Sequence, residues 1–132
     1  MKDCIFYVGQ GCPICARVKW ALRRLEIGGL LHVIPVDVGI NRKNSSMDFY
    51  DYLSGYWGGG RRVPVLKIGR EVHMVSKFYT VLGETTEIED WDELDKQVFA
   101  LEQTIREDLR KAEPESEPYL THELLKERIF IG

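Results

Sequence analysis

Cys12-Pro13-Ile14-Cys15 is the feature that most constrains how this chain can fold. The two cysteines follow a strand-like run at residues 4–8 and open a helix-like run that begins at Pro13. A thiol at a helix N-terminus faces unpaired backbone N–H groups and the positive end of the helix dipole, and both favour thiolate over thiol. Proline suits the first helical position, where its missing N–H is not needed. The motif therefore predicts a strand, a turn and a helix that together present a reactive cysteine.

The composition predicts one ordinary soluble domain with an appended segment. The chain has 132 residues, of which 44% are hydrophobic and 30% are charged, so it can bury a core and keep a polar surface. The sequence shows neither a secretory signal pattern nor an apolar run long enough for a membrane span. We therefore expect a cytoplasmic protein without membrane contact. In that compartment a C-x-x-C pair is more often redox-active or metal-binding than structural.

Charge is divided unevenly along the chain. Residues 1–83 carry 12 basic and 6 acidic side chains, whereas residues 84–132 carry 6 basic and 15 acidic ones. We therefore expect a domain at 1–83 and an acidic helical extension with a tail at 84–132. The basic part suits an anionic small molecule or an acidic partner. It lacks the basic cluster that would predict nucleic-acid binding.

The first part has the pattern of a strand, a helix and a strand followed by a hairpin. Apolar residues recur at helical spacing in residues 13–26. Residues 31–38 are rich in Val and Ile, as in a buried parallel strand. The other expected elements are a helix from a Ser45 or Ser46 cap to about Leu53, a strand at 62–68, its hairpin partner at 71–75, and a short helix at 76–82 capped by Ser76.

The second part contains a long amphipathic helix. Apolar residues step by three and four from Trp91 to Leu109, and the helix is expected to start at Thr85 or Thr86 and to end at about residue 113. The apolar stripe of such a helix has to be buried. It could pack on the first part, over Trp20 and its neighbouring arginines, or pair with a second copy as a short coiled coil. We expect intramolecular packing and a monomer rather than a homodimer.

Pro64 within a strand pattern is the second informative feature, because proline weakens a strand ladder and belongs at an edge or carries a cis peptide bond. The strand–C-P-x-C–helix order, Tyr7 five residues before Cys12, and the run Gly60-Arg61-Arg62-Val63-Pro64 together resemble the glutaredoxin branch of the thioredoxin-like family. The resemblance covers residues 4 to about 82. It implies an α/β fold of thioredoxin-like, glutaredoxin type, with a mixed four-stranded sheet flanked by helices, to which the C-terminal amphipathic helix is added.

The resemblance also implies a function and site residues. It implies a thiol–disulfide oxidoreductase in which Cys12 is the nucleophile and Cys15, the more buried cysteine, is the resolving thiol. Pro64 would be the cis-proline facing the disulfide, and Val63 would offer its backbone to an extended, peptide-like substrate. The substrates would be protein disulfides or glutathione-mixed disulfides. No bound cofactor is implied, and glutathione is a possible reductant.

Other substrate-binding candidates each have a structural alternative. Ser76 could bind the γ-glutamyl carboxylate of glutathione, as in the glutathione-transferase-like branch, or be a plain helix cap. Arg61 and Arg62 could hold a carboxylate or be solvated surface charges, and in an edge strand at most one of them would line the groove. Tyr7 could wall the site or lie in the core. Pro13, between the cysteines, is the remaining substrate-binding candidate.

Two other function classes remain open. The chain could be a binding module or redox sensor on a thioredoxin-like scaffold whose C-terminal helix docks a partner. It could also be a metal or iron–sulfur carrier, but His32, His73 and His122 lie at no metal-ligand spacing relative to the cysteines, so we expect no metal. We expect Cys4 to be a buried core thiol rather than a third redox partner.

Overall fold

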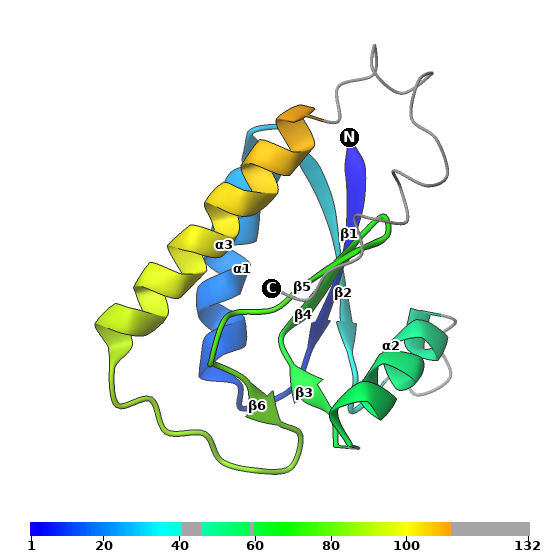
Figure 1. Ribbon diagram of the computed structural model, residues 1–132, viewed down its shortest axis with the longest axis vertical. Coiled ribbons are helices and arrows are strands. Elements are labelled where there is room, and N and C mark those ends of the chain that lie inside the picture. Colours follow the sequence, from blue (N-terminus) through cyan, green and yellow to red (C-terminus); the bar gives the residue numbers. More distant parts are fainter. Residues whose placement is uncertain (41–45, 59, 112–132) are drawn as a thin grey trace.

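The computed structural model describes residues 1–40, 46–58 and 60–111 as a mixed α/β fold on a central four-stranded sheet (Figure 1). The elements are β1 (Lys2–Val8), α1 (Pro13–Ile27), β2 (Leu31–Asp37), α2 (Ser46–Ser54), the short 3-10 helix η1 (Gly55–Trp57), β3 (Arg62–Val63), β4 (Val65–Ile68), β5 (Glu71–His73), β6 (Thr80–Val81) and α3 (Trp91–Lys111). The strand order is β2-β1-β4-β5, with β1 parallel to β2 and with β4 antiparallel to both β1 and β5. The predicted mixed four-stranded sheet is thus confirmed.

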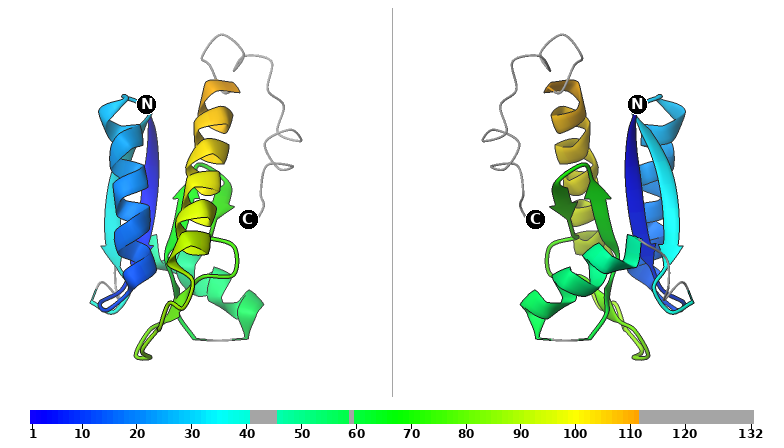
Figure 2. Two further views of the ribbon diagram at one scale, coloured as in Figure 1. Left: turned by 90° about the vertical axis from the view of Figure 1, so that its left-hand side faces the viewer. Right: turned by 90° about the vertical axis from the view of Figure 1, so that its right-hand side faces the viewer.

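Helices cover both faces of the sheet. α1 and α3 lie side by side on one face, and α2 lies on the other (Figures 1 and 2). Side chains of β1 alternate between these layers, as the period of a strand requires. Phe6 lines a groove beside α1, whereas the ring of Tyr7 lies 4.9 Å from that of Tyr50 in α2.

α1 buries the face that its sequence spacing predicts. The buried residues are Ile14, Cys15, Val18, Ala21, Leu22 and Leu25. The helix ends at Gly28, and Gly29 follows with a φ of 74°, a conformation that glycine adopts without a steric cost. The predicted strand, helix and parallel strand therefore form as expected, which places the N-terminus of α1 at the end of β1.

β2 is parallel, but the expectation that it is buried is wrong. It lies at the edge of the sheet, and His32, Ile34 and Pro35 are exposed. A strand at an edge has a neighbouring strand on one side only. A groove also lies between α1 and β2, lined in part by Val33 and Pro35.

α3 begins at Trp91 rather than at Thr85 or Thr86. The Asp90 carboxylate accepts a hydrogen bond from the backbone N–H of Glu93 at 2.9 Å and thereby satisfies one of the free donors at the helix N-terminus. Trp91 is 42% exposed, but most of the predicted stripe is buried. Its buried members are Leu94, Val98, Leu101 and Ile105.

The prediction that α3 packs on the first part of the chain is confirmed. Arg24 of α1 donates hydrogen bonds to the Glu102 carboxylate of α3, the shortest at 2.6 Å. Arg17 lies 3.3 Å from Asp95 and over the ring of Trp91. The prediction that α3 covers Trp20 is wrong, since the Trp20 side chain is 65% exposed. The neighbouring Arg17 and Arg24 make the contacts with α3 instead. The monomeric state stays a prediction.

Glu102 should make stability depend on pH. Hydrogen bonds from Arg24 hold the pKa of this carboxyl below its usual value, so the pair stabilises the fold fully above the ordinary glutamate pKa of about 4.3 and loses this contribution as the pH falls through the lowered pKa. We expect Glu102→Gln to lower the free energy of unfolding by about 1–3 kcal/mol at pH 7. At a pH below the lowered pKa, where Glu102 itself is protonated, the substitution should change the free energy of unfolding little. Urea unfolding at both pH values tests this, with the exposed Glu107→Gln as control. An equal loss at both pH values would contradict it.

Residues 76–82 do not form the expected helix. Lys77 follows Ser76 with a φ of 67°, outside the helical region, and the chain then enters β6, which pairs antiparallel with β3. Val63 lies opposite Thr80, and the Leu82 N–H donates to the Arg61 carbonyl at 2.8 Å. Thr and Val at positions 80 and 81 are β-branched and favour a strand.

The expected boundary at residue 83 falls in the loop between β6 and α3. The division into two segments stays a prediction, but residues on both sides contribute to one hydrophobic core. The expected cap at Ser45 or Ser46 lies outside the residues whose side chains are described, although α2 itself spans Ser46–Ser54. In the described parts of the chain, no helix combines the length and apolar character needed to cross a membrane.

Candidate active site

Cys12 is the N-cap residue of α1. Its backbone is extended, with φ −100° and ψ 103°, and its sulfur accepts a hydrogen bond from the Cys15 N–H at 3.0 Å. Pro13 occupies the first turn, where no N–H is required, and is partly exposed beside the pair. Gly11 has a φ of 71° in the turn that joins β1 to α1. The local sequence thus places a cysteine sulfur at the N-terminus of a helix, where it accepts a hydrogen bond from the Cys15 N–H.

Cys12 and Cys15 form a disulfide, with their Cα atoms 5.3 Å apart. Their exposed fractions are 8% and 7%, so the expectation that Cys15 is the more buried of the two has no support. None of the residues in the first turn of α1 is acidic, so no neighbouring carboxylate there opposes a thiolate. The pair is set just beneath the surface at the start of α1.

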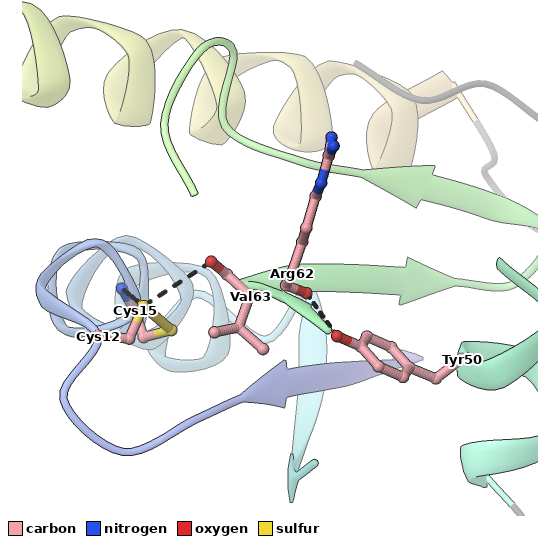
Figure 3. The surroundings of a disulfide bond; sticks show 5 residues. All are labelled: Cys12, Cys15, Tyr50, Arg62 and Val63. Atoms are coloured by element: carbon pink, nitrogen blue, oxygen red, sulfur yellow. Dashed lines mark hydrogen bonds between the residues drawn. A yellow bond between two sulfur atoms is a disulfide. The ribbon is translucent and has the colours of Figure 1, made fainter. Parts of the chain in front are cut away.

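The peptide bond between Val63 and Pro64 is cis, as the resemblance implied. The Val63 carbonyl oxygen lies 3.9 Å from the Cys12 sulfur, although the two residues are 51 positions apart in sequence (Figure 3). The Tyr50 hydroxyl donates to the preceding carbonyl, that of Arg62, at 2.6 Å and so ties this segment to α2. The fold therefore brings the two anchors of the resemblance into contact.

Val63 does not offer a free strand edge to a substrate. Its backbone lies opposite Thr80 in the β3–β6 ladder, so the chain itself occupies the edge that was expected to receive an extended peptide. The expected role of Val63 is corrected in this respect. A Cβ on Gly9 would lie 3.1 Å from Leu82 and 3.3 Å from Val63, which shows how closely the residue after β6 approaches the turn before Cys12.

Arg61 and Arg62, which were expected to bind a substrate carboxylate, interact with other residues of the protein instead. Arg61 donates to the Val38 carbonyl and lies 3.4 Å from the Asp51 carboxylate. The Arg62 guanidinium lies 4.4 Å from the centre of the Tyr79 ring and 5.5 Å from that of Trp57. Its side chain points away from the disulfide (Figure 3). The structure therefore gives both guanidinium groups partners other than the cysteines.

Tyr7 and Ser76 also lie away from the place expected for a substrate. Tyr7 is fully buried against Tyr50, and burial raises the pKa of its hydroxyl to about 12, so it belongs to the core beneath the site. Ser76 is exposed and starts no helix, and it lines a cavity against α3 together with His73. The helix N-terminus expected to help it bind a carboxylate is absent from this segment.

A groove beside Cys15 was not predicted. It has a volume of about 320 Å³ and runs between α1 and β2. Phe6, Val33 and Pro35 give it an apolar floor. Along α1, Lys19 and Arg23 supply positive charge and Glu26 supplies one negative charge. The sequence signal was present but ambiguous, because Lys19 and Arg23 are four residues apart on the polar side of the predicted helix.

Cys4 is a free thiol with no exposed surface, as predicted. Burial, assisted by the negative charge of Glu26, raises the pKa of Cys4 to about 12, so it is protonated at neutral pH.

Comparisons of the chain with known protein families, curated proteins and solved structures found no match. The case for function therefore depends on the geometry of the Cys12–Cys15 pair.

Proposed function

We propose that this chain is a cytoplasmic thiol–disulfide oxidoreductase with a thioredoxin-like fold of glutaredoxin type. The observation that carries the proposal is the position of the Cys12 sulfur. It caps α1, is bonded to Cys15 and lies 3.9 Å from the carbonyl before the cis-proline. A cysteine pair that can form a disulfide thus lies at a helix N-terminus, which is an environment that activates cysteine.

The proposed cycle starts from the dithiol. The Cys12 thiolate attacks one sulfur of a substrate disulfide, the substrate's sulfur–sulfur bond breaks, and the first substrate thiolate leaves and takes up a proton. Cys15 then loses its proton and attacks the Cys12 sulfur, which releases the second substrate thiol and leaves the Cys12–Cys15 disulfide. The substrate gains two electrons and two protons, and an external thiol reductant returns them to the protein.

Cys12 is the better nucleophile of the pair because of its backbone contacts. In the reduced protein the Cys15 N–H, at 3.0 Å from the Cys12 sulfur, would stabilise a thiolate. The Val63 carbonyl, at 3.9 Å, would instead accept a hydrogen bond from a Cys12 thiol and so favour the neutral form. The shorter contact and the helix dipole both favour the charged form, so they outweigh the distant carbonyl.

The site favours compact disulfides over extended peptides. β6 occupies the strand edge at Val63, so a peptide can add there only if β6 leaves. The groove at Cys15 suits an anionic small molecule, since Lys19 and Arg23 lie along it against the single carboxylate of Glu26, which leaves a net positive charge. We propose low-molecular-weight anionic disulfides, including glutathione-mixed disulfides, as the preferred substrate class.

Thr80→Pro tests this preference. Proline lacks the N–H of Thr80 and weakens the β3–β6 ladder at the residue opposite Val63. We expect reduction of an extended disulfide peptide to become about fivefold faster, because about 1 kcal/mol of pairing is lost, while reduction of a small disulfide stays the same. Thr80→Val is the matched control, since it keeps the N–H and removes only a hydroxyl that has no hydrogen-bond partner among the described residues. A peptide-to-small-disulfide rate ratio unchanged by Thr80→Pro would count against the preference.

A redox sensor is the second candidate. Both sulfurs are nearly buried, and β6 lies between the Val63 edge and any partner. In this case the disulfide state would control partner binding, and reduction of small disulfides would be slow.

Turnover distinguishes the two candidates. The protein is supplied with a small disulfide and NADPH, and with either glutathione and its reductase or thioredoxin reductase. The proposal predicts sustained NADPH consumption with at least one of the two reducing systems. Consumption no faster than without the protein in both systems would refute the enzyme and favour the sensor.

A further inference from the structure

A second cluster of reactive side chains lies between β5 and α3, and it plays no part in the proposed redox cycle. Glu71 and His73 are two residues apart in β5 and therefore point to the same face of the strand. Asp108 reaches the same place from α3. One ligand atom from each of the three side chains lies within 4.8 Å of the other two, and the His73 Nε2 lies 3.3 Å from a Glu71 carboxylate oxygen.

These three side chains are largely withdrawn from water. His73 is 1% exposed and Glu71 is 9% exposed. Asp108 is partly buried, and its Oδ2 is fully buried without a hydrogen-bond partner in the part of the chain that the structure describes. A buried carboxylate oxygen without a partner, here Oδ2 of Asp108, is costly away from water, and two neighbouring carboxylates repel each other. A bound cation would give the Asp108 oxygen a ligand and reduce the repulsion between the carboxylates.

The donor set identifies the class of cation. One imidazole nitrogen and two carboxylates suit a divalent transition metal such as Zn²⁺ or Mn²⁺, whereas Mg²⁺ and Ca²⁺ prefer oxygen donors alone. Zinc–ligand distances of about 2.0–2.2 Å imply ligand atoms about 3.4 Å apart, so side-chain shifts of about 1 Å would close the present cluster around an ion. A cavity of about 140 Å³ borders His73 and reaches Thr104, one helical turn before Asp108, which leaves room for a water as a further ligand.

We propose that Glu71, His73 and Asp108 bind one divalent transition-metal ion, and that this ion ties the C-terminal part of α3 to β5. The site is separate from the disulfide, because α3 ends at the opposite end of the helical layer from the N-terminus of α1 (Figure 1). The sequence contained half of the signal, a Glu-x-His in a strand. The third ligand is 35 residues further along the chain and could not be paired with it from spacing alone.

Zinc titration of the oxidised protein tests the proposal, because the Cys12–Cys15 disulfide removes the thiolates that would otherwise bind zinc. Calorimetry near pH 7 should show about one equivalent of Zn²⁺ bound, and excess Zn²⁺ should raise the midpoint of thermal unfolding. Asp108→Asn, which keeps the side-chain shape, should weaken binding about tenfold or more, and Glu71→Gln should do the same. Glu107→Gln, an exposed neighbour on α3, should behave as the wild type.

Several results would overturn the proposal. One is the absence of Zn²⁺ binding and of any thermal shift, and another is an equal affinity in Asp108→Asn and Glu107→Gln. A comparable shift with Mg²⁺ would overturn the transition-metal assignment. Should Asp108→Asn or Glu71→Gln fail to fold, the wild type provides a second readout. Dilute Mn²⁺ should selectively broaden the NMR signals of the His73 ring, and broadening only at the exposed His32 would refute the site.

Discussion

Cys12→Ser is expected to abolish disulfide reduction, with a rate loss of about a thousandfold or more. The Cys12 sulfur caps α1 and accepts a hydrogen bond from the Cys15 N–H, whereas a serine hydroxyl at the same position remains protonated and is a far weaker nucleophile at neutral pH. The measurement is NADPH consumption in the coupled assay with a small disulfide. The fold should persist, because the hydroxyl can still cap α1.

Cys4→Ala is the matched control for this result. Cys4 is fully buried, and its pKa of about 12 keeps it protonated, so it offers no thiolate. Its replacement should leave the rate unchanged and lower only the stability of the fold. A Cys12→Ser protein as active as the wild type, or a Cys4→Ala protein that loses activity while still folded, would show that the nucleophile has been misassigned.

Leu94→Ala is expected to lower the free energy of unfolding by about 2–5 kcal/mol, and Ile105→Ala by a similar amount. These side chains of α3 are 0% and 1% exposed, and they complete the core that α1 and the sheet leave open. Urea unfolding followed by circular dichroism measures the change. Phe99→Ala, on the same helix but 60% exposed, should change the stability by no more than about 0.5 kcal/mol.

The role of α3 in the core leads to a further expectation for residues 1–83. Without α3, the chain should lose cooperative unfolding, because the side chains beneath Leu94 and Ile105 would face water. A cooperative transition in the chain truncated after Gly83, or equal effects of Leu94→Ala and Phe99→Ala, would mean that α3 is an accessory to a domain that is stable by itself.

Features with local causes could be predicted from the sequence. The β1–α1 unit follows from an apolar run, a proline at the first helical position and apolar residues at helical spacing, all within the first 27 residues. The amphipathic stripe of α3 was equally clear. Its start could have been read more accurately, since Asp90 followed three residues later by Glu93 is a helix-capping pattern.

Features that depend on distant residues could not be predicted in the same way. Nothing local to Ser76 shows that Lys77 will adopt a positive φ, or that Thr80 will pair with Val63. That pairing depends on the tertiary fold, and it changes the expected substrate edge. The groove beside Cys15 likewise requires β2 to lie at the sheet edge, which a run rich in Val and Ile did not indicate.

The most direct test of the proposed mechanism is to trap its intermediate. In Cys15→Ser the resolving thiol is missing, so a substrate disulfide attacked by Cys12 should remain attached to it. After incubation of the reduced variant with a small disulfide, peptide mass mapping should find one adduct, at Cys12, while Cys4 remains a free thiol. No adduct at Cys12, or one at Cys4 in the folded protein, would contradict the assignment of Cys12 as the nucleophile of a dithiol oxidoreductase.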